Sequence, residues 1–386
     1  MDILLIVLAD IQRDARTLNM ARTLRDAGLK VGVVAAGRLP DAEAGSGVTF
    51  IEWADPGGRA FLRMRSLREF LLCNVAVLLD ECPPKALYAM DFFVLSATVG
   101  LGKQLRVPVA YDMREFMFSL GPLEGKGIKQ LFITWSERRL LTRVKAISVS
   151  GTADSTIVSK RFKLKSEPTV ILNTPPYRDR VEHSSLLRER FSIPSAAFVI
   201  VYQGVVHHGR GLAPMMRALV EMPDVHLCIV GDGPFRSPLE DIAIQTRVAD
   251  RVHWLGSVPY DELHAWTCSA DAGCCLIEPV SMSYEYALPN KLFEYMMARI
   301  PSLVTDLPAL HDHIMRYPVG MLVDRTLSVG AITEAVRRMR VPATYDGFVE
   351  QCKVARELSY ENQAHHVIDM VSRLTEKGRD HAIRNR

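Results

Sequence analysis

Short apolar runs alternate with longer amphipathic stretches through the first half of the chain. Residues 3–8 are continuously apolar, residues 15–27 repeat apolar side chains at helical spacing, and residues 31–36 are apolar again. Strands buried on both faces are apolar along their whole length, as in parallel sheets covered by helices. The pattern therefore predicts βαβ units around a parallel sheet, with Gly28 ending the first helix.

The same alternation restarts in the second half after an interruption. Residues 177–194, YRDRVEHSSLLRERFSIP, are charged and show no strand pattern, and a new apolar run, FVIVYQ, begins at Phe198. Further runs follow, separated by helical stretches: HLCIVG, VHWLG, AGCCLI, PSLVT and GMLV. This order predicts a second doubly wound α/β unit, with strand-to-helix loops as the places where ligands bind.

The length and the interruption together predict the domain organisation. A chain of 386 residues exceeds what one core usually covers, so we expect two domains. The predicted boundaries are 1–176 for an N-terminal domain, 195–345 for a C-terminal domain, and 346–386 for a helical segment with a basic tail.

Composition excludes several classes of protein. A formal net charge of +3 with 24% charged residues gives no strong overall field, so nucleic acid is not an expected partner. The seven cysteines contain no C-x-x-C pair, which favours a reducing compartment. The start, MDILLIVLAD, lacks the basic region of a signal peptide, and no apolar run is long enough to span a bilayer. We expect a cytoplasmic protein that at most attaches to a membrane surface.

Two N-terminal stretches mix basic and apolar residues at helical spacing. They are GRAFLRMRSLREFLL, residues 58–72, and KGIKQLFITWSERRLLTRVKAI, residues 126–147. A helix lying on an anionic membrane has this composition. A packed helix with a solvated basic face has it too, because long basic side chains cover apolar surface. Both interpretations stay open from the sequence.

The loop GVVHHGRGL, residues 204–212, follows a predicted strand and leads into a helix. Free backbone N–H groups at such a place attract phosphate, and Arg210 would add a charge-assisted hydrogen bond. Gly204 would let a ligand approach the backbone. An ordinary turn with a surface arginine has the same sequence. His207 and His208 lack a third ligand at metal-site spacing, so we predict no metal here.

The next loop, IVGDGPF, excludes a familiar cofactor. Arg236 stands where the third glycine of a G-x-G-x-x-G fingerprint belongs, so a nicotinamide dehydrogenase is disfavoured. Gly231 and Gly233 still allow a turn close to a ligand, although a simple tight turn explains them as well.

The stretch YALPNKLFEYMMA, residues 286–298, combines a buried-helix pattern with charges. Pro289 suits a helix start, so a helix is predicted from about Asn290 to Ala298 with free N–H groups at its beginning. Glu294 lies among apolar side chains and needs hydrogen-bond donors, which ribose hydroxyls can supply. The alternative is a simple ion pair with Lys291 on the same helix face.

Taken together, these segments resemble glycosyltransferase family four, retaining nucleotide-sugar enzymes of the GT-B fold. The resemblance rests on VYQGVVHHGRGL, IVGDGP, RVHWLGSVPYDEL, ADAGCCLIEP and YALPNKLFEYMMARIPSLVT in the second half, and on RDARTLNMARTLRDAGLKVGVVAAG, AYDMRE and VILNTPP in the first. It implies an α/β GT-B fold: two Rossmann-like doubly wound domains facing a central cleft, with the C-terminal helix packing back toward the N-terminal domain.

The resemblance also assigns roles to residues. Glu294 matches the second glutamate of the family's E-x7-E motif, which binds the ribose hydroxyls, and Arg210 matches the basic residue that grips the diphosphate. Lys291 would add a second positive charge, and these three residues are the predicted catalytic set. The predicted donor-binding residues are Gly204, Arg210, Gly231, Leu288, Pro289, Asn290, Lys291 and Glu294. Neither a metal nor a cofactor is implied; the nucleotide-diphospho-sugar is a co-substrate.

Some positions depart from the family pattern. Tyr286 replaces the first glutamate of E-x7-E, so contact with the sugar would come from Tyr286 or Glu285. Asp112 and Arg114 lie in a stretch that lines the site in relatives, and we expect them near the sugar or the acceptor. Arg299 replaces the glycine that usually ends the helix, so a retained turn there would be strained.

Two further residues of the first loop, Asp14 and Arg16, are either acceptor contacts or a helix-capping pair, and the cap is favoured. The resulting prediction is a transferase that moves a sugar from a nucleotide-diphospho-sugar to a saccharide or lipid-linked saccharide, with retention, in bacterial surface polysaccharide or glycolipid assembly. The alternatives are a nucleotide-sugar epimerase or phosphorylase on the same fold, and a catalytically degenerate glycan-binding or scaffold protein.

Overall fold

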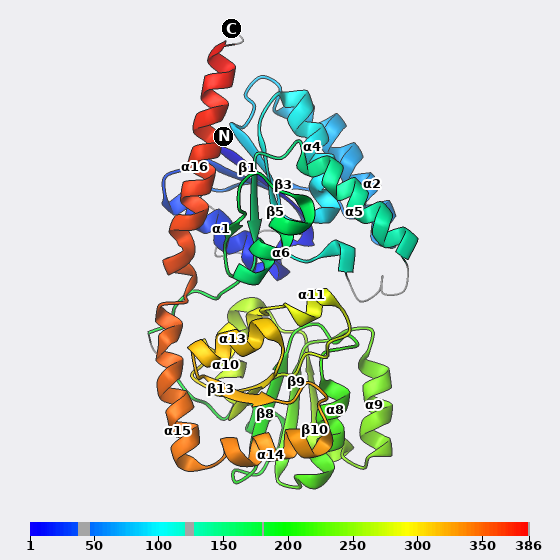
Figure 1. The fold of residues 1–386 in the computed structure, drawn as a ribbon, viewed down its shortest axis with the longest axis vertical. Helices are drawn as coiled ribbons and strands as arrows, with labels where there is room; N and C mark the ends of the chain where they lie inside the picture. The colour runs from blue at the N-terminus through cyan, green and yellow to red at the C-terminus, as the bar shows by residue number, and fades with distance from the viewer. Residues whose placement is uncertain (38–46, 120–126, 180, 385–386) are drawn as a thin grey trace. The chain divides into compact units, whose positions relative to one another are not determined.

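The computed structural model describes residues 1–37, 47–119, 127–179 and 181–384. The chain forms two compact units, Met1–Asn173 with Tyr360–Arg386, and Thr174–Ser359. Each unit is an α/β unit with its own parallel sheet (Figure 1). The prediction of two doubly wound domains is confirmed.

The first unit is built on a seven-stranded sheet of order β3-β2-β1-β4-β5-β6-β7, with every neighbouring pair parallel. The inner strand β1 is apolar from Ile3 to Ala9 because β2 and β4 flank it and helices cover it: Ile3 pairs with Val31 on one side and with Ala86 on the other. The strands are β1 Ile3–Asp10, β2 Val31–Ala36, β3 Thr49–Glu52, β4 Ala86–Ala89, β5 Val109–Met113, β6 Ala146–Val149 and β7 Thr169–Val170.

Helices cover both faces of this sheet. They are α1 Ala15–Asp26, α2 Ala60–Glu69, α3 Ala76–Leu78, α4 Phe92–Leu105, α5 Gly127–Leu141, α6 Thr152–Phe162 and α16 Tyr360–Arg384. A π-helical segment, Phe70–Val75, joins α2 to α3. The C-terminal α16 lies alongside α1 (Figure 1), and its Val367 and Val371 are buried in the same core as Leu24 of α1. The predicted return of the C-terminal helix to the N-terminal domain is therefore confirmed.

The second unit has a six-stranded parallel sheet of order β10-β9-β8-β11-β12-β13. Its strands are β8 Phe198–Gln203, β9 Val225–Val230, β10 Val252–Gly256, β11 Ala272–Cys275, β12 Ser302–Thr305 and β13 Gly320–Val323. Its helices are α7 Leu186–Phe191, α8 Leu212–Ala218, α9 Arg236–Gln245, α10 Tyr260–Thr267, α11 Met282–Glu285, α12 Asn290–Met297, α13 Pro308–Arg316, α14 Val329–Met339 and α15 Pro342–Gln351. The helix expected at 290–298 thus ends one residue early.

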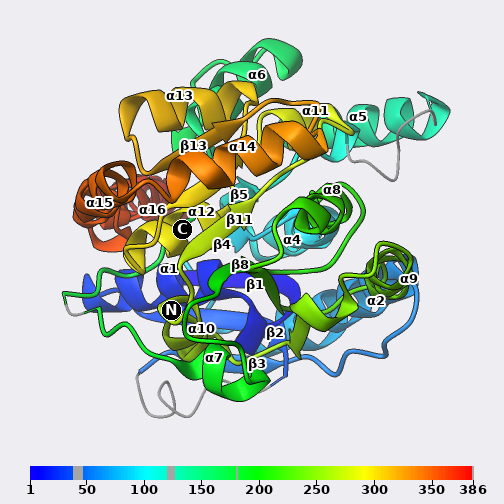
Figure 2. The same ribbon diagram turned by 90° about the horizontal axis from the view of Figure 1, so that it is seen from below.

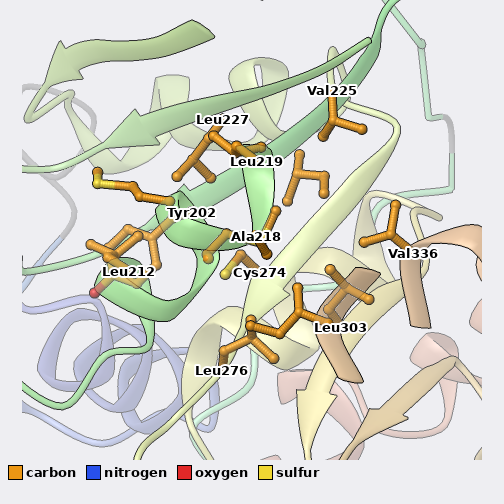
Figure 3. Close-up of a cluster of buried hydrophobic side chains, with 14 of the residues drawn as sticks. Tyr202, Leu212, Ala218, Leu219, Val225, Leu227, Cys274, Leu276, Leu303 and Val336 are labelled. Atoms are coloured by element: carbon orange, nitrogen blue, oxygen red, sulfur yellow. The ribbon is translucent and has the colours of Figure 1, made fainter. Parts of the chain in front are cut away.

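One apolar cluster fixes the strands of the second unit to the helices that position its loops. Figure 3 shows strand residues Tyr202, Leu227 and Cys274 gathered with Leu212 and Ala218 of α8, and all five are buried. Because α8 begins at Leu212, this packing holds the end of the preceding loop in place.

The C-terminal segment expected from residue 346 is divided between the units. Tyr345 of α15 donates a hydrogen bond to the backbone oxygen of Asp271 at 2.9 Å, and the thiol of Cys352 is buried against the carbonyl of Ile300 at 3.8 Å. These contacts keep α15 with the second unit, and only α16 belongs to the first. No helix of the described residues is long and apolar enough to cross a membrane.

Helix α12 ends in a left-handed turn that its sequence does not favour. Arg299 has φ of 54°, with its N–H bonded to the carbonyl of Met296 at 3.0 Å and that of Ile300 bonded to Tyr295 at 3.1 Å. These two bonds are the Schellman pattern that usually places glycine at this position. The turn is retained, so its strain is retained too.

Replacing Arg299 by glycine is expected to raise the free energy of unfolding by about 1 kcal/mol, because the left-handed backbone costs an L-residue more than glycine's extra chain entropy. Urea unfolding measures this change. Arg299→Ala removes the side chain but keeps the strain, so it should give no gain. Equal stabilisation by both variants would contradict a backbone origin.

Candidate functional site

The predicted donor residues meet where the second sheet reverses its strand order. Strand β8 lies between β9 and β11, so the connections leaving β8 and β11 diverge at their carboxyl ends. Ligands of doubly wound folds bind at such a switch point. The first connection carries Gly204 and Arg210, and the second leads through α11 to α12, which lies beside β11 (Figure 2).

Two glycines let the backbones of neighbouring loops touch. Gly231 has φ of 151°, and a Cβ there would overlap the carbonyl of Gly204. Gly204 has φ of 119°, and a Cβ added to it would lie 3.8 Å from Nζ of Lys291. Because Gly204 has no side chain, the Lys291 amine lies next to bare backbone. Gly231 has a packing role, and its contact with a ligand stays a prediction.

Arg210 is held by an aromatic contact, and one of its hydrogen-bond donors has no partner among the described residues. Its guanidinium carbon lies 4.6 Å from the ring centroid of Tyr284, a cation–π contact between the two connections. Its Nε is buried and has no hydrogen-bond partner in the described part of the chain. A buried, unsatisfied donor on a charged group is costly, so this side chain is suited to receive an acceptor from a ligand.

Lys291 is a second cation beside the first. Lys291 is only 9% exposed, and its Nζ lies 3.6 Å from the ring centroid of Tyr202. Burial, and after it the nearby charge of Arg210, lowers the pKa of Lys291 to about 7. Two cations thus share a confined space, and an anion placed between them would relieve both costs.

Glu294 is bound by a neutral partner rather than by the lysine. The side-chain amide of Gln203 donates a hydrogen bond to the Glu294 carboxylate. Across the described ranges, no ion pair within 4.0 Å joins Glu294 to Lys291. Burial raises the pKa of Glu294, although Gln203 and Lys291 act in the opposite direction. The simple ion pair considered from the sequence is therefore not formed.

Gln203 and Thr267 support this carboxylate, and the sequence analysis did not single them out. The hydroxyl of Thr267 donates to the Gln203 side-chain oxygen at 2.7 Å, which turns the amide nitrogen toward Glu294. Both residues are buried. The available signal was a polar residue, Gln203, at the last position of an apolar strand, because a polar strand end commonly faces a site.

Comparison with known proteins gives the family of both units. Residues 14–173 match the family described as "Glycosyl transferase 4-like domain", and residues 197–340 match the family described as "Glycosyl transferases group 1". The chain is built from two glycosyltransferase domains. They span most of the two sheets and include every predicted donor residue.

The fold of the whole chain has close likenesses among solved structures. Sucrose-phosphate synthase from Thermosynechococcus elongatus superposes with a TM-score of 0.76 at 15% identity, covering 98% of this chain and 100% of that one. HepE from Anabaena, solved with UDP and glucose, gives 0.73 at 14% identity and covers 98% and 99%. These likenesses establish a two-domain GT-B fold.

A curated relative gives a shorter match. The lipopolysaccharide core biosynthesis glycosyltransferase LpsD of Rhizobium meliloti is 29% identical over 157 residues, which is 40% of this chain and 42% of that protein. The GT-B chain thus spans less than half the length of that relative.

The start of α12 in the GT-B chain is the place where the sequence predicts contact with the donor. Pro289 is the N-cap with φ of −79° and ψ of 147°, and Asn290 is the first helical residue. Leu288 and Pro289 lead into the helix, and the first N–H groups, which have no acceptor within a helix, belong to Asn290 and the residues after it because proline has no N–H. Their contact with phosphates or sugar stays a prediction.

The residues around the missing glutamate have other contacts. Glu285 lies within 3.0 Å of Arg325 in a half-exposed ion pair. Tyr286 is the C-cap of α11 and is partly buried. Within the described residues, no group of three or more His, Cys, Asp or Glu side chains is arranged to hold a metal ion. His207 and His208 are both exposed.

Asp112 and Arg114 lie in a buried ion network of the first unit. Asp112 is fully buried and accepts from Arg16 at 2.7 and 2.8 Å, from Ser148 at 2.5 Å and from Arg114 at 3.1 Å. Burial opposes its ionisation, but Arg16 and Arg114 outweigh burial and hold the pKa of Asp112 below its ordinary value. The aspartate has a structural role, and its contact with a substrate stays a prediction.

Arg114 also anchors the first helix of the chain. It donates to Asp14 at 2.8 Å and to the hydroxyl of Thr17 at 2.8 Å. Asp14 caps α1 by accepting from the Thr17 N–H at 3.0 Å, as predicted, whereas Arg16 pairs with Asp112 instead of Asp14. The Arg114 side chain is 22% exposed.

Glu294→Gln is expected to stabilise the ligand-free protein, and more so at pH 8 than at pH 5. The raised pKa means that the folded state holds the proton more tightly, so the wild-type free energy of unfolding falls as pH rises above the unfolded value near 4.5. The neutral amide has no such dependence. Urea unfolding at both pH values measures the difference between the two proteins.

The control is Glu334→Gln, an exposed glutamate on α14 that forms an ion pair with Arg337. This variant should show the same difference in free energy of unfolding between pH 8 and pH 5 as the wild-type protein. A Glu294→Gln protein that is no more stable than wild type at pH 8 would contradict a carboxylate that is costly to keep ionised.

Proposed function

We propose that the protein transfers a sugar from a nucleotide-diphospho-sugar to an acceptor hydroxyl, with retention of configuration and without a metal ion. The observation that carries this proposal is a pair of cations: the partly buried Arg210, whose buried Nε has no partner within the described residues, and the buried Lys291, whose amine lies beside the bare backbone of Gly204. A diphosphate carries the two negative charges that such a pair needs. The UDP and glucose bound by the GT-B neighbour HepE support a donor of this class.

Glu294 would hold the ribose of that donor. A carboxylate already oriented by Gln203 keeps further acceptor capacity for the two ribose hydroxyls, which are donors. It lies one turn into α12, whereas Lys291 lies in the first turn. The pentose and the diphosphate would therefore bind along one helix, in the order in which a nucleotide-diphospho-sugar carries them.

The chemistry then requires stabilisation of the leaving group. The bond between the anomeric carbon and the donor phosphate oxygen breaks, and negative charge grows on that oxygen. Arg210, Lys291 and the amino end of α12 supply fixed positive charge there. The acceptor oxygen bonds to the same face of the carbon, and its proton passes to the departing phosphate.

The acceptor is proposed from similarity alone. The relative LpsD is described as an enzyme of lipopolysaccharide core biosynthesis. By analogy, we propose a saccharide or lipid-linked saccharide acceptor in bacterial surface polysaccharide or glycolipid assembly.

Arg210→Ala is expected to lower kcat by about 10²- to 10³-fold, because one transition-state charge donor is lost. The donor is found first by thermal-shift screening with UDP, GDP, ADP and TDP sugars, since a ligand of the folded state raises its stability. Steady-state kinetics with that donor then measure the loss. Glu294→Ala should also lower kcat, and it should weaken donor binding as well.

Arg217→Ala is the matched control, because Arg217 is an exposed arginine on the neighbouring helix α8. It should keep wild-type turnover. Full activity of both Arg210→Ala and Glu294→Ala would refute the proposed site. Nucleotide binding without turnover on any acceptor would instead favour a glycan-binding protein.

A further inference from the structure

Helix α5 of the first unit presents an apolar stripe to the outside. Ile128, Leu131, Phe132 and Trp135 are 86%, 71%, 65% and 57% exposed. Their spacing of i, i+3, i+4 and i+7 puts them on one face of the helix. A helix of a water-soluble domain normally turns such a stripe toward the core, so this face is made for an apolar environment.

On α5 the acidic side chain is buried and the basic side chains are exposed. Its one acid, Glu137, is fully buried and accepts a hydrogen bond from the hydroxyl of Tyr111 at 2.9 Å. The exposed charges on α5 are Lys129, Arg138 and Arg139, all positive, and exposed Arg143 and Lys145 follow directly. The outer face of α5 is therefore apolar and cationic.

Helix α2 gives a useful contrast. It packs on α4, as α5 does (Figure 1), and it also exposes apolar side chains, Phe61 and Leu62. Its basic residues are partly neutralised, however, because Arg63 pairs with Asp55 at 2.6 Å and Arg65 pairs with Glu69 at 3.0 Å. The α2 stretch keeps two exposed basic residues without an ion pair in the described part of the chain, Arg59 and Arg68, so α5 and the residues after it have the larger unneutralised charge. Lys126 lies outside the described residues.

We propose that α5 docks the protein on an anionic bilayer surface, with its apolar stripe among the acyl chains and its lysine and arginines at the headgroups. Charge complementarity selects this occupant, because an anionic lipid surface meets both the apolar and the cationic part of the face. Trp135 suits the interface, with the Arg139 guanidinium 5.8 Å from its ring. With 15 residues, α5 is too short to span a bilayer of roughly 30 Å and would lie flat.

This inference does not depend on the proposed sugar transfer. The α5 stripe lies in the first unit, and the cation pair that would hold the donor lies in the second. Vesicle binding needs neither donor nor acceptor, so its failure would leave the proposed function standing, and the reverse also holds.

The test is flotation of the full chain with vesicles. We expect binding to vesicles in which about a third of the lipid is phosphatidylglycerol, weaker binding to pure phosphatidylcholine, and release at high salt. Leu131→Gln with Trp135→Gln should lower the partition coefficient by about ten-fold or more. Lys129→Gln with Arg139→Gln should remove the preference for anionic lipid. These side chains are exposed, so folding should be unaffected.

The matched control exchanges apolar residues exposed to a similar degree elsewhere. Ile244→Gln with Met315→Gln, at 67% and 68% exposure in the second unit, should bind like wild type. Tryptophan emission should shift to the blue on binding, and Trp135→Phe should abolish that shift. The proposal is overturned if wild type fails to float at low salt, if the α5 variants bind equally well, or if the stripe proves to join two copies of the chain in solution.

Discussion

Two cations without an anion, Arg210 and Lys291, are the constraint around which the second unit is organised. Lys291 is buried, the Nε of Arg210 is buried without a hydrogen-bond partner, and no carboxylate within the described residues forms an ion pair with either. The aromatic faces of Tyr284 and Tyr202 compensate part of the resulting cost. A ligand with two negative charges would offset the remaining cost of these unpaired cations.

The first unit also has arginines, Arg16 and Arg114, but carboxylates of the same unit neutralise them. Arg16 and Arg114 share Asp112, and Arg114 also pairs with Asp14. That network ties β5 to α1 and leaves little charge unpaired. Because the arginines of the first unit are neutralised and the two cations of the second unit are not, we propose that the anionic donor binds to the second unit.

Much of this could be predicted from the sequence. Continuous apolar runs predicted both sheets because parallel strands are buried on two faces, and Pro289 predicted the start of α12. The Gln203–Thr267 support of Glu294 could not be predicted, because those residues lie 91 and 27 positions away from it and meet only through the strand order. Nor could the roles of Asp112 and Arg114, which depend on partners about 100 residues away.

The most direct test of the central claim is proton uptake on donor binding. The diphosphate of a nucleotide sugar has no group that titrates near neutrality, whereas Lys291 has a pKa of about 7 and would be held protonated by an anion. Calorimetry at pH 8 in buffers of different ionisation enthalpy should show uptake of a fraction of a proton, lost in Lys291→Gln, and affinity that falls as pH rises above 7. Binding without proton uptake, at equal affinity in both proteins, would contradict the account.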